Sequence, residues 1–201
     1  IAIDKAKGSN MPKENIERAI NRGAGIGDDV AAMEEVTYEG YGPHGVAIVI
    51  DTVTDNKNRT LADIKYVFNR NGGSLASAGA VLWQFEQKGY IAVNAQGVNY
   101  DDLFLIAADA GADDVQQDDD TFDIYTPREA LAKVARELIE AGYKIVESEL
   151  TWMAKNELEL PTDQSLQIMS LIEKLEDLDD VQSVASNLQL SSEVVAALEA
   201  R

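Results

Sequence analysis

Residues 38–60 read YEGYGPHGVAIVIDTVTDNKNRT, and this stretch decides the fold that we expect. A short strand leads into the Gly-Pro-His-Gly sequence at residues 42–45, which favours a tight turn because proline fixes φ and glycine accepts positive φ. Residues 46–53 form an apolar, β-branched run, which is typical of a central strand buried on both faces. Asp55 and Asn56 end this strand and offer a cap for a helix over residues 59–71. The stretch therefore predicts a strand, a turn, a second strand and a helix.

The predicted helix over residues 59–71 has two faces. The apolar face, which we expect to be buried, carries Leu61, Ile64, Val67 and Phe68. The opposite face carries a polar stripe made of Arg59, Asp63, Tyr66 and Arg70. Two interpretations of the stripe stay open: a surface that faces phosphate groups, or an ordinary solvent-exposed helix face.

The composition bounds the architecture and the compartment. The 201 residues suffice for one large domain or two to three small ones. The absence of cysteine excludes disulfides, thiolate catalysis and Cys-ligated zinc, and it suits a cytoplasmic protein. No apolar run approaches the roughly 18 residues that span a bilayer, so we expect no membrane partner. The chain begins with Ile1 instead of methionine, and we expect its natural N-terminus to be missing.

The charge is strongly negative and unevenly distributed. The formal net charge is −19, whereas residues 1–27 carry five basic and three acidic side chains and therefore +2. An acidic surface repels phosphate, so we expect any contact with nucleic acid to be confined to a basic region. The sequence predicts a mildly basic head on an acidic body.

The first part of the chain reads as the remnant of a helical domain. A helix is predicted to begin at Pro12 and to place Ile16, Ala19 and Ile20 on one apolar face. The Gly-rich residues 23–27 then form a flexible link.

Residues 71–79, NGGSLASAG, have the composition of a phosphate loop but lack the Gly-Lys-Ser/Thr ending of a P-loop. A helix end followed by a hinge is the better interpretation. Residues 81–85 then alternate as a strand, in which Trp83 and Phe85 share a face, so we expect both in the core and not on a base-stacking surface.

From Tyr90 onward the pattern predicts βαββαβ, an order that commonly gives a four-stranded antiparallel sheet with two helices on one face. The last part of the chain predicts a short strand at residues 157–160, a helix at 163–178 and a final strand at 181–190.

Three segments resemble the YebC family, which is also called the TACO1 family. They are residues 38–60, NMPKENIERAINRGAG at residues 10–25 and LEDLDDVQSVASN at residues 175–187, and the resemblance covers essentially the whole chain. It implies an α+β fold with a helical N-terminal domain and two ferredoxin-like-type α+β domains, the third inserted in the second. The expected domains are 1–27, a remnant; 28–78 with 157–201; and 79–156, the insertion. Family members normally carry a further basic, helical segment before the stretch that corresponds to residues 10–25.

The resemblance also implies a function. Members are described as probable DNA-binding transcriptional regulators of the cytoplasm, and other members behave as translation activators or ribosome-associated factors. We therefore expect a non-enzymatic regulator of gene expression, monomeric, with DNA as its partner; the alternative is a translation factor that contacts the ribosome through ribosomal RNA or tRNA. An enzyme that uses a cleft between domains is a third hypothesis, and no catalytic set supports it.

Several side chains with catalytic or metal-binding potential have simpler interpretations. His44 is the only histidine and has no partner in the sequence pattern, so we expect a turn residue. The acidic run at residues 118–120 lacks spaced ligands and favours a hairpin turn. Asp177, Asp179 and Asp180 favour a solvated helix end. We expect no catalytic residue, no metal and no cofactor.

The candidates for nucleic-acid contact are cations and the aromatic side chains near them. Exposed tyrosines beside Lys57 and Arg59 would pair base stacking with phosphate binding. The candidate set is Lys5, Lys7, Lys13, Arg18, Arg22, Tyr38, Tyr41, Lys57, Arg59 and Arg70.

Overall fold

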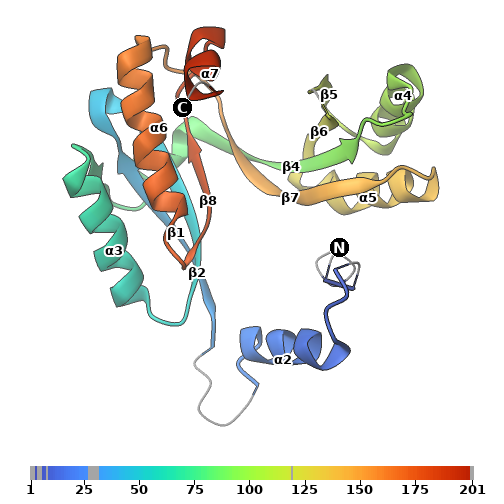
Figure 1. Ribbon diagram of the computed structural model, residues 1–201, viewed down its shortest axis with the longest axis horizontal. Coiled ribbons are helices and arrows are strands. Elements are labelled where there is room, and N and C mark those ends of the chain that lie inside the picture. The colour runs from blue at the N-terminus through green and yellow to red at the C-terminus, as the bar shows by residue number, and fades with distance from the viewer. Residues whose placement is uncertain (1–2, 4–5, 8, 27–31, 119, 200–201) are drawn as a thin grey trace. The chain divides into compact units, whose positions relative to one another are not determined.

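The computed structural model of the chain describes residues 3, 6–7, 9–26, 32–118 and 120–199 (Figure 1). It divides into two compact units: Ile1–Gln84 with Ala154–Arg201, and Phe85–Met153. Each unit contains a four-stranded sheet of its own and α-helices besides. The chain therefore has the α+β class that the sequence predicts.

The sheet of the first unit has the strand order β3-β1-β2-β8. Its strands are β1 (Glu34–Tyr41), β2 (Ala47–Thr54), β3 (Ser74–Leu75) and β8 (Val181–Ser186). The neighbouring strands are antiparallel throughout. β2 lies in the centre, and the side chains from Val46 to Ile50 are completely buried, as the apolar run predicts. The 3-10 turn η1 (Pro43–Gly45) joins β1 to β2.

Two helices cover one face of this sheet. α3 (Lys57–Arg70) and α6 (Thr162–Glu176) lie side by side and pack on the same core, which also contains the buried side chains of β2 (Figure 1). Asn56 caps α3 by accepting a hydrogen bond from the Arg59 backbone N–H, as predicted. The predicted apolar face of α3 is correct for Ile64 and Phe68 and wrong for Leu61, which is 38% exposed.

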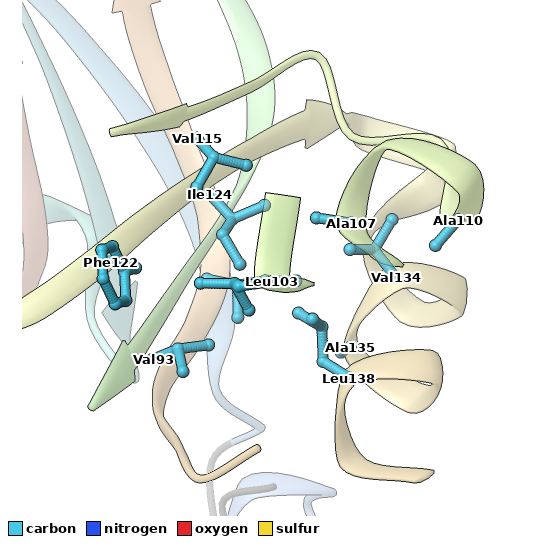
Figure 2. Close-up of a cluster of buried hydrophobic side chains, with 11 residues drawn as sticks. Val93, Leu103, Ala107, Ala110, Val115, Phe122, Ile124, Val134, Ala135 and Leu138 are labelled. Atoms are coloured by element: carbon cyan, nitrogen blue, oxygen red, sulfur yellow. The ribbon is translucent and has the colours of Figure 1, made fainter. Parts of the chain in front are cut away.

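The second unit follows the predicted βαββαβ order. Its elements are β4 (Phe85–Asn94), α4 (Tyr100–Ala110), β5 (Asp114–Gln117), β6 (Thr121–Pro127), α5 (Leu131–Glu140) and β7 (Ile145–Ala154). The sheet order is β5-β6-β4-β7, so the first and third strands of the unit lie together in the centre. Figure 2 shows Leu103 of α4 among Ile124 and Val93 of the sheet and Leu138 of α5, and all four side chains are buried.

Two predictions are wrong in the segment that precedes the second unit. Of residues 81–85 only Phe85 belongs to a strand, as the first residue of β4, because Leu82–Gln84 is a 3-10 turn (η2). Trp83 is 67% exposed and not in the core, whereas Phe85 is buried as predicted. The predicted hinge also contains a strand, β3, which the sequence pattern did not indicate.

The C-terminal part differs as well. The predicted strand at residues 157–160 reduces to a single bridge between Leu158 and Leu188. The predicted final strand ends at Ser186 and is followed by a helix, α7 (Ser192–Glu199). The helix α2 (Lys13–Gly23) follows Pro12, as predicted.

Candidate nucleic-acid interface

Helix α2 presents its cations to solvent. The side chain of Lys13 is 87% exposed and lies 3.5 Å from the Glu17 carboxylate, one turn along the helix. Arg18 and Arg22 are exposed and are separated by four residues, so they share one helix face. α2 therefore offers a short row of guanidinium groups.

The predicted apolar face of α2 is only partly buried. Ile16 is 8% exposed, whereas Ile20 is 47% exposed and Ala19 is exposed as well. Lys7, which precedes α2, is exposed. Lys5 lies outside the described residues.

Tyr38 and Lys57 lie next to each other, as the candidate pair requires. The Tyr38 hydroxyl donates to the Lys57 backbone carbonyl over 3.3 Å, and the Lys57 ammonium pairs with the Glu34 carboxylate. Burial raises the pKa of Tyr38, an effect that the charge of Lys57 partly offsets. Because Tyr38 is half-buried and packs against the core of the first unit, it presents only part of its ring to solvent.

Tyr41 lies elsewhere. It is three residues from Tyr38 on β1, so the two side chains leave opposite faces of the sheet. Its hydroxyl donates to the Ala80 backbone carbonyl over 3.1 Å, and the residue is half-buried. The structure therefore does not bring the two tyrosines together, and neither is fully exposed.

Arg59 is held by carboxylates. One of its terminal nitrogens donates to both oxygens of Asp180 and to Asp55, each over 2.9 Å. The hydrogen bonds with Asp180 and Asp55 raise the pKa of Arg59. Much of the capacity of this guanidinium to bind a phosphate is therefore already used.

Asp180 has a structural role that the sequence pattern did not predict. It accepts hydrogen bonds from Thr60 over 2.7 Å and from Thr54 over 3.2 Å, in addition to those from Arg59. Burial alone would raise the pKa of Asp180, but these hydrogen bonds lower it below its ordinary value. Asp180 is thus a structural link between β2, α3 and the loop before β8, and the prediction of a solvated helix end is wrong for it.

The surroundings of Arg59 are acidic. A hollow beside the N-terminal end of α3 is lined by two guanidinium groups, those of Arg22 and Arg59, and by a larger set of carboxylates that comprises Asp55, Asp63, Asp177, Asp179 and Asp180. Such a concentration of negative charge repels phosphate. This end of α3 therefore does not favour nucleic acid.

Arg70 lies at the opposite end of α3, about 16 Å along the helix axis from Arg59. Its guanidinium carbon is 5.7 Å from the centre of the Tyr66 ring, which is a cation–π distance. Tyr66 is 62% exposed. The polar stripe of α3 therefore has an acidic end at Arg59 and a basic, aromatic end at Arg70.

The residues with catalytic or metal-binding potential adopt turn geometry. His44 has a φ of 61°, and its Nε2 is 3.2 Å from Oε1 of Gln167. The Asp118 backbone N–H donates to the Thr121 carbonyl over 2.9 Å across the β5–β6 turn, and Asp119 lies outside the described residues. Within the described ranges, no group of three or more His, Cys, Asp or Glu side chains is arranged to hold a metal ion. Nor does any helix in those ranges combine the length and the apolar character needed to cross a membrane.

The fold and the exposed cations define a class: an α+β protein with two compact units and a basic helix near its N-terminus. The family model described as the TACO1/YebC second and third domain matches residues 33–188. The chain therefore belongs to the TACO1/YebC family, which confirms the resemblance of the three sequence segments.

Individual relatives agree with this assignment. A probable transcriptional regulatory protein of Roseiflexus castenholzii is 48% identical over 197 residues, which cover 96% of this chain and 77% of the relative. A probable transcriptional regulatory protein of Chloroflexus aurantiacus is 47% identical over 202 residues, covering 100% of this chain and 80% of the relative. The crystal structure of a conserved hypothetical protein from Aquifex aeolicus matches with a TM-score of 0.88 at 40% identity, over 96% of this chain and 80% of that one.

Proposed function

We propose that this chain is a non-enzymatic, cytoplasmic regulator of gene expression that contacts nucleic acid, with DNA-binding transcriptional regulation as the first candidate. The names of the relatives support regulation of transcription. The observation that carries the nucleic-acid contact is the charge contrast. Residues 1–27 carry +2 and include the exposed cations of α2, whereas the remainder of the chain carries −21.

A second candidate is a translation factor that associates with the ribosome and contacts ribosomal RNA or tRNA. The acidic surface favours it, because such a surface repels duplex DNA but can lie against basic ribosomal proteins while a local basic region contacts RNA.

The proposed interface contains cations from two places. α2 and its approach supply Lys5, Lys7, Lys13, Arg18 and Arg22, and the first unit supplies Lys57 and Arg70. Tyr38 and Tyr41 would contribute only their accessible edges, since both are half-buried. Arg59 is the member with least support, since carboxylates already hold it.

The proposed domain organisation keeps a helical remnant at 1–27, a middle domain of 28–78 with 157–201 and an inserted domain at 79–156. Two observations support it: the division into two compact units, and the family description of residues 33–188 as a second and a third domain.

Two binding assays test the function side by side. Co-sedimentation with ribosomes and a gel shift on promoter DNA are carried out with the wild-type chain and with the triple variant K13E/R18E/R22E. Because phosphate contacts carry no sequence information, the variant should lose affinity for all sequences, and its salt slope should fall by about 2 to 3.

The matched control is K133E/R136E/K144E, which makes the same change of charge in the second unit. It should bind like the wild type. Equal losses in both triple variants would show that only the overall charge matters, and binding without any salt dependence would contradict a phosphate interface.

A further inference from the structure

An open groove of about 630 Å³ lies between the C-terminal end of α3 and α6. Its walls carry two cations, Arg70 from α3 and Lys174 from α6, and neutral polar side chains that include Asn71 and Gln167. Of the described residues that line it, only Asp163 carries a carboxylate. The groove is therefore the basic counterpart of the acidic hollow at the other end of α3.

Lys174 is held in place across the groove. Its ammonium donates to Oδ1 of Asn71 over 2.7 Å, and the Asn71 amide donates to the Val67 carbonyl over 2.7 Å. This chain of hydrogen bonds places the ammonium at the C-terminal end of α3, where the helix dipole favours positive charge. An ammonium has three N–H donors, so two remain for a ligand.

Arg70 and Tyr66 form the neighbouring part of the surface. The guanidinium lies over the ring at 5.7 Å, and the tyrosine remains 62% exposed. Within the described ranges, no carboxylate forms an ion pair with Arg70, so the charge of Arg70 is available to a ligand. A cation beside an exposed aromatic ring is the combination that proteins use for a phosphate and an adjacent unpaired base.

The η1 turn packs against α6, and its residue His44 contacts a side chain that lines the groove. His44 has a φ of 61°, a left-handed conformation that is uncommon outside glycine, and its ring reaches Gln167 in the groove wall. His44 therefore contacts the groove wall through Gln167 and is not itself one of the side chains that line the groove.

We propose that this groove binds a segment of single-stranded nucleic acid, with Arg70 and Lys174 paired to phosphate and Tyr66 stacked on a base. The inference rests on the proposed function, that the chain contacts nucleic acid, and it adds the form of the ligand. A single strand is favoured over a duplex because Tyr66 can stack only on a base that is not already paired and stacked.

The test measures fluorescence anisotropy of labelled single-stranded RNA, single-stranded DNA of the same sequence and the corresponding duplex, over a series of salt concentrations. R70Q and K174Q should each weaken single-strand binding severalfold and reduce the salt slope by about 0.7, the loss of one phosphate contact. Y66A should weaken binding about tenfold and leave the salt slope unchanged, since stacking involves no counterion.

K65Q is the matched control, because Lys65 is an exposed cation on the same helix that does not line the groove. It should bind within twofold of the wild type. Thermal unfolding of each variant checks the fold, and R70Q and Y66A keep the test decisive if K174Q is destabilised by loss of its bond to Asn71. The RNA and DNA arms identify which single strand is preferred, and preference for either one supports the groove.

Three results would overturn the inference. If the wild type binds nucleic acid while R70Q and Y66A bind equally well, the groove is not the site, and the proposed function stands. If the duplex binds as tightly as the single strands, the stacking role of Tyr66 fails. If the wild type binds none of the three probes, the inference and the nucleic-acid part of the proposed function fail together.

Discussion

At the scale of single residues, the buried carboxylate of Glu39 organises a loop that local sequence does not explain. Its side chain is on β1, it is 4% exposed, and it accepts hydrogen bonds from three backbone N–H groups, those of Gly79, Val81 and Leu82. Burial alone would raise the pKa of Glu39, but the three donors lower it below its ordinary value. The carboxylate thereby replaces the strand partners that residues 79–82 lack.

We expect E39Q to reduce the free energy of unfolding by roughly 1–3 kcal/mol, the usual cost of leaving buried donors without an acceptor. The glutamine amide group presents its own N–H donors to backbone N–H groups, which aggravates the loss. Urea unfolding at neutral pH measures the difference, and E35Q on the same strand is the control, since Glu35 is exposed. Equal stability of E39Q and the wild type would show that the loop is held by other contacts.

The same pair of proteins gives a prediction for pH. Because the pKa of Glu39 is lower in the folded chain, its stabilisation is complete above the ordinary glutamate pKa of about 4.3 and is lost as pH falls through the folded value. The difference in unfolding free energy between wild type and E39Q should therefore be constant from pH 5 to 7 and shrink below about pH 4. A difference that grows in acid would contradict the assignment.

Asp180 gives a second prediction at this scale. D180N removes the charge that holds Arg59 and weakens the acceptor for Thr60 and Thr54, so it should lower the melting temperature. We expect a cost of roughly 1–3 kcal/mol, as for hydrogen bonds to charged groups. D179N, one residue away and exposed, should change the melting temperature little. If both variants melt alike, Asp180 is no structural link.

At the scale of elements, β1 and α3 approach closely because Gly40 has no side chain. A Cβ atom at this position would lie 2.5 Å from the Phe68 ring and 2.9 Å from the Ser74 backbone carbonyl. Phe68 is completely buried on α3, and Ser74 belongs to β3. Gly40 therefore sets the distance between a helix and two strands.

G40A should destabilise the first unit by roughly 1–3 kcal/mol, the usual cost of overpacking a core. Chemical unfolding followed by tryptophan and tyrosine fluorescence measures it. G23A is the control, because a Cβ at Gly23 meets no atom within 4 Å and alanine favours a helix. An unchanged midpoint in G40A would mean that the core has room for a methyl group at this position.

The elements that follow local periodicity were predictable from sequence. The apolar run of β2, the helix α6 and the βαββαβ order of the second unit follow from local patterns, and the structure contains each of them. The candidate interface was only partly predictable: α2 has its cations exposed, but the pairing of Arg59 with Asp180 joins residues 121 positions apart.

The failures have two physical origins: contacts between residues that are distant in the sequence, and an element too short to show a pattern. Residues 81–85 alternate like a strand, yet the Glu39 carboxylate, about 40 residues earlier, binds their backbone N–H groups and winds them into a turn. β3 has two residues, too few for any periodic pattern. A contact between distant residues outweighs local preference, and periodicity contains no information about such contacts.

At the scale of the whole molecule, each unit has a hydrophobic core of its own. The eleven buried side chains of the second core all belong to residues 91–138, whereas the first core combines β2 and α3 with α6 and Leu188. β2 and β6 belong to separate sheets. The core of the second unit therefore needs only one continuous segment of the chain, whereas the core of the first unit needs two segments that are distant in the sequence.

We expect a fragment of residues 77–156 to fold cooperatively by itself, because it contains a complete sheet and its core. Circular dichroism during thermal unfolding should show a single transition. The comparison fragment, residues 28–84, lacks β8 and α6 and should show none. A gradual, non-cooperative loss of structure in the fragment of residues 77–156 would refute the proposed inserted domain.

The pairing of β2 with β8 has a consequence for biosynthesis. β2 ends at Thr54, whereas its partner begins at Val181, so the ribosome makes the entire second unit between the two strands. Domains generally fold as units while the chain emerges. The second unit can therefore finish folding first. During that time, the edge of β2 that pairs with β8 in the folded chain remains unpaired in the nascent β1–β2 hairpin. Slow translation of residues 154–186 would prolong that stage, during which an unpaired edge can pair with another chain.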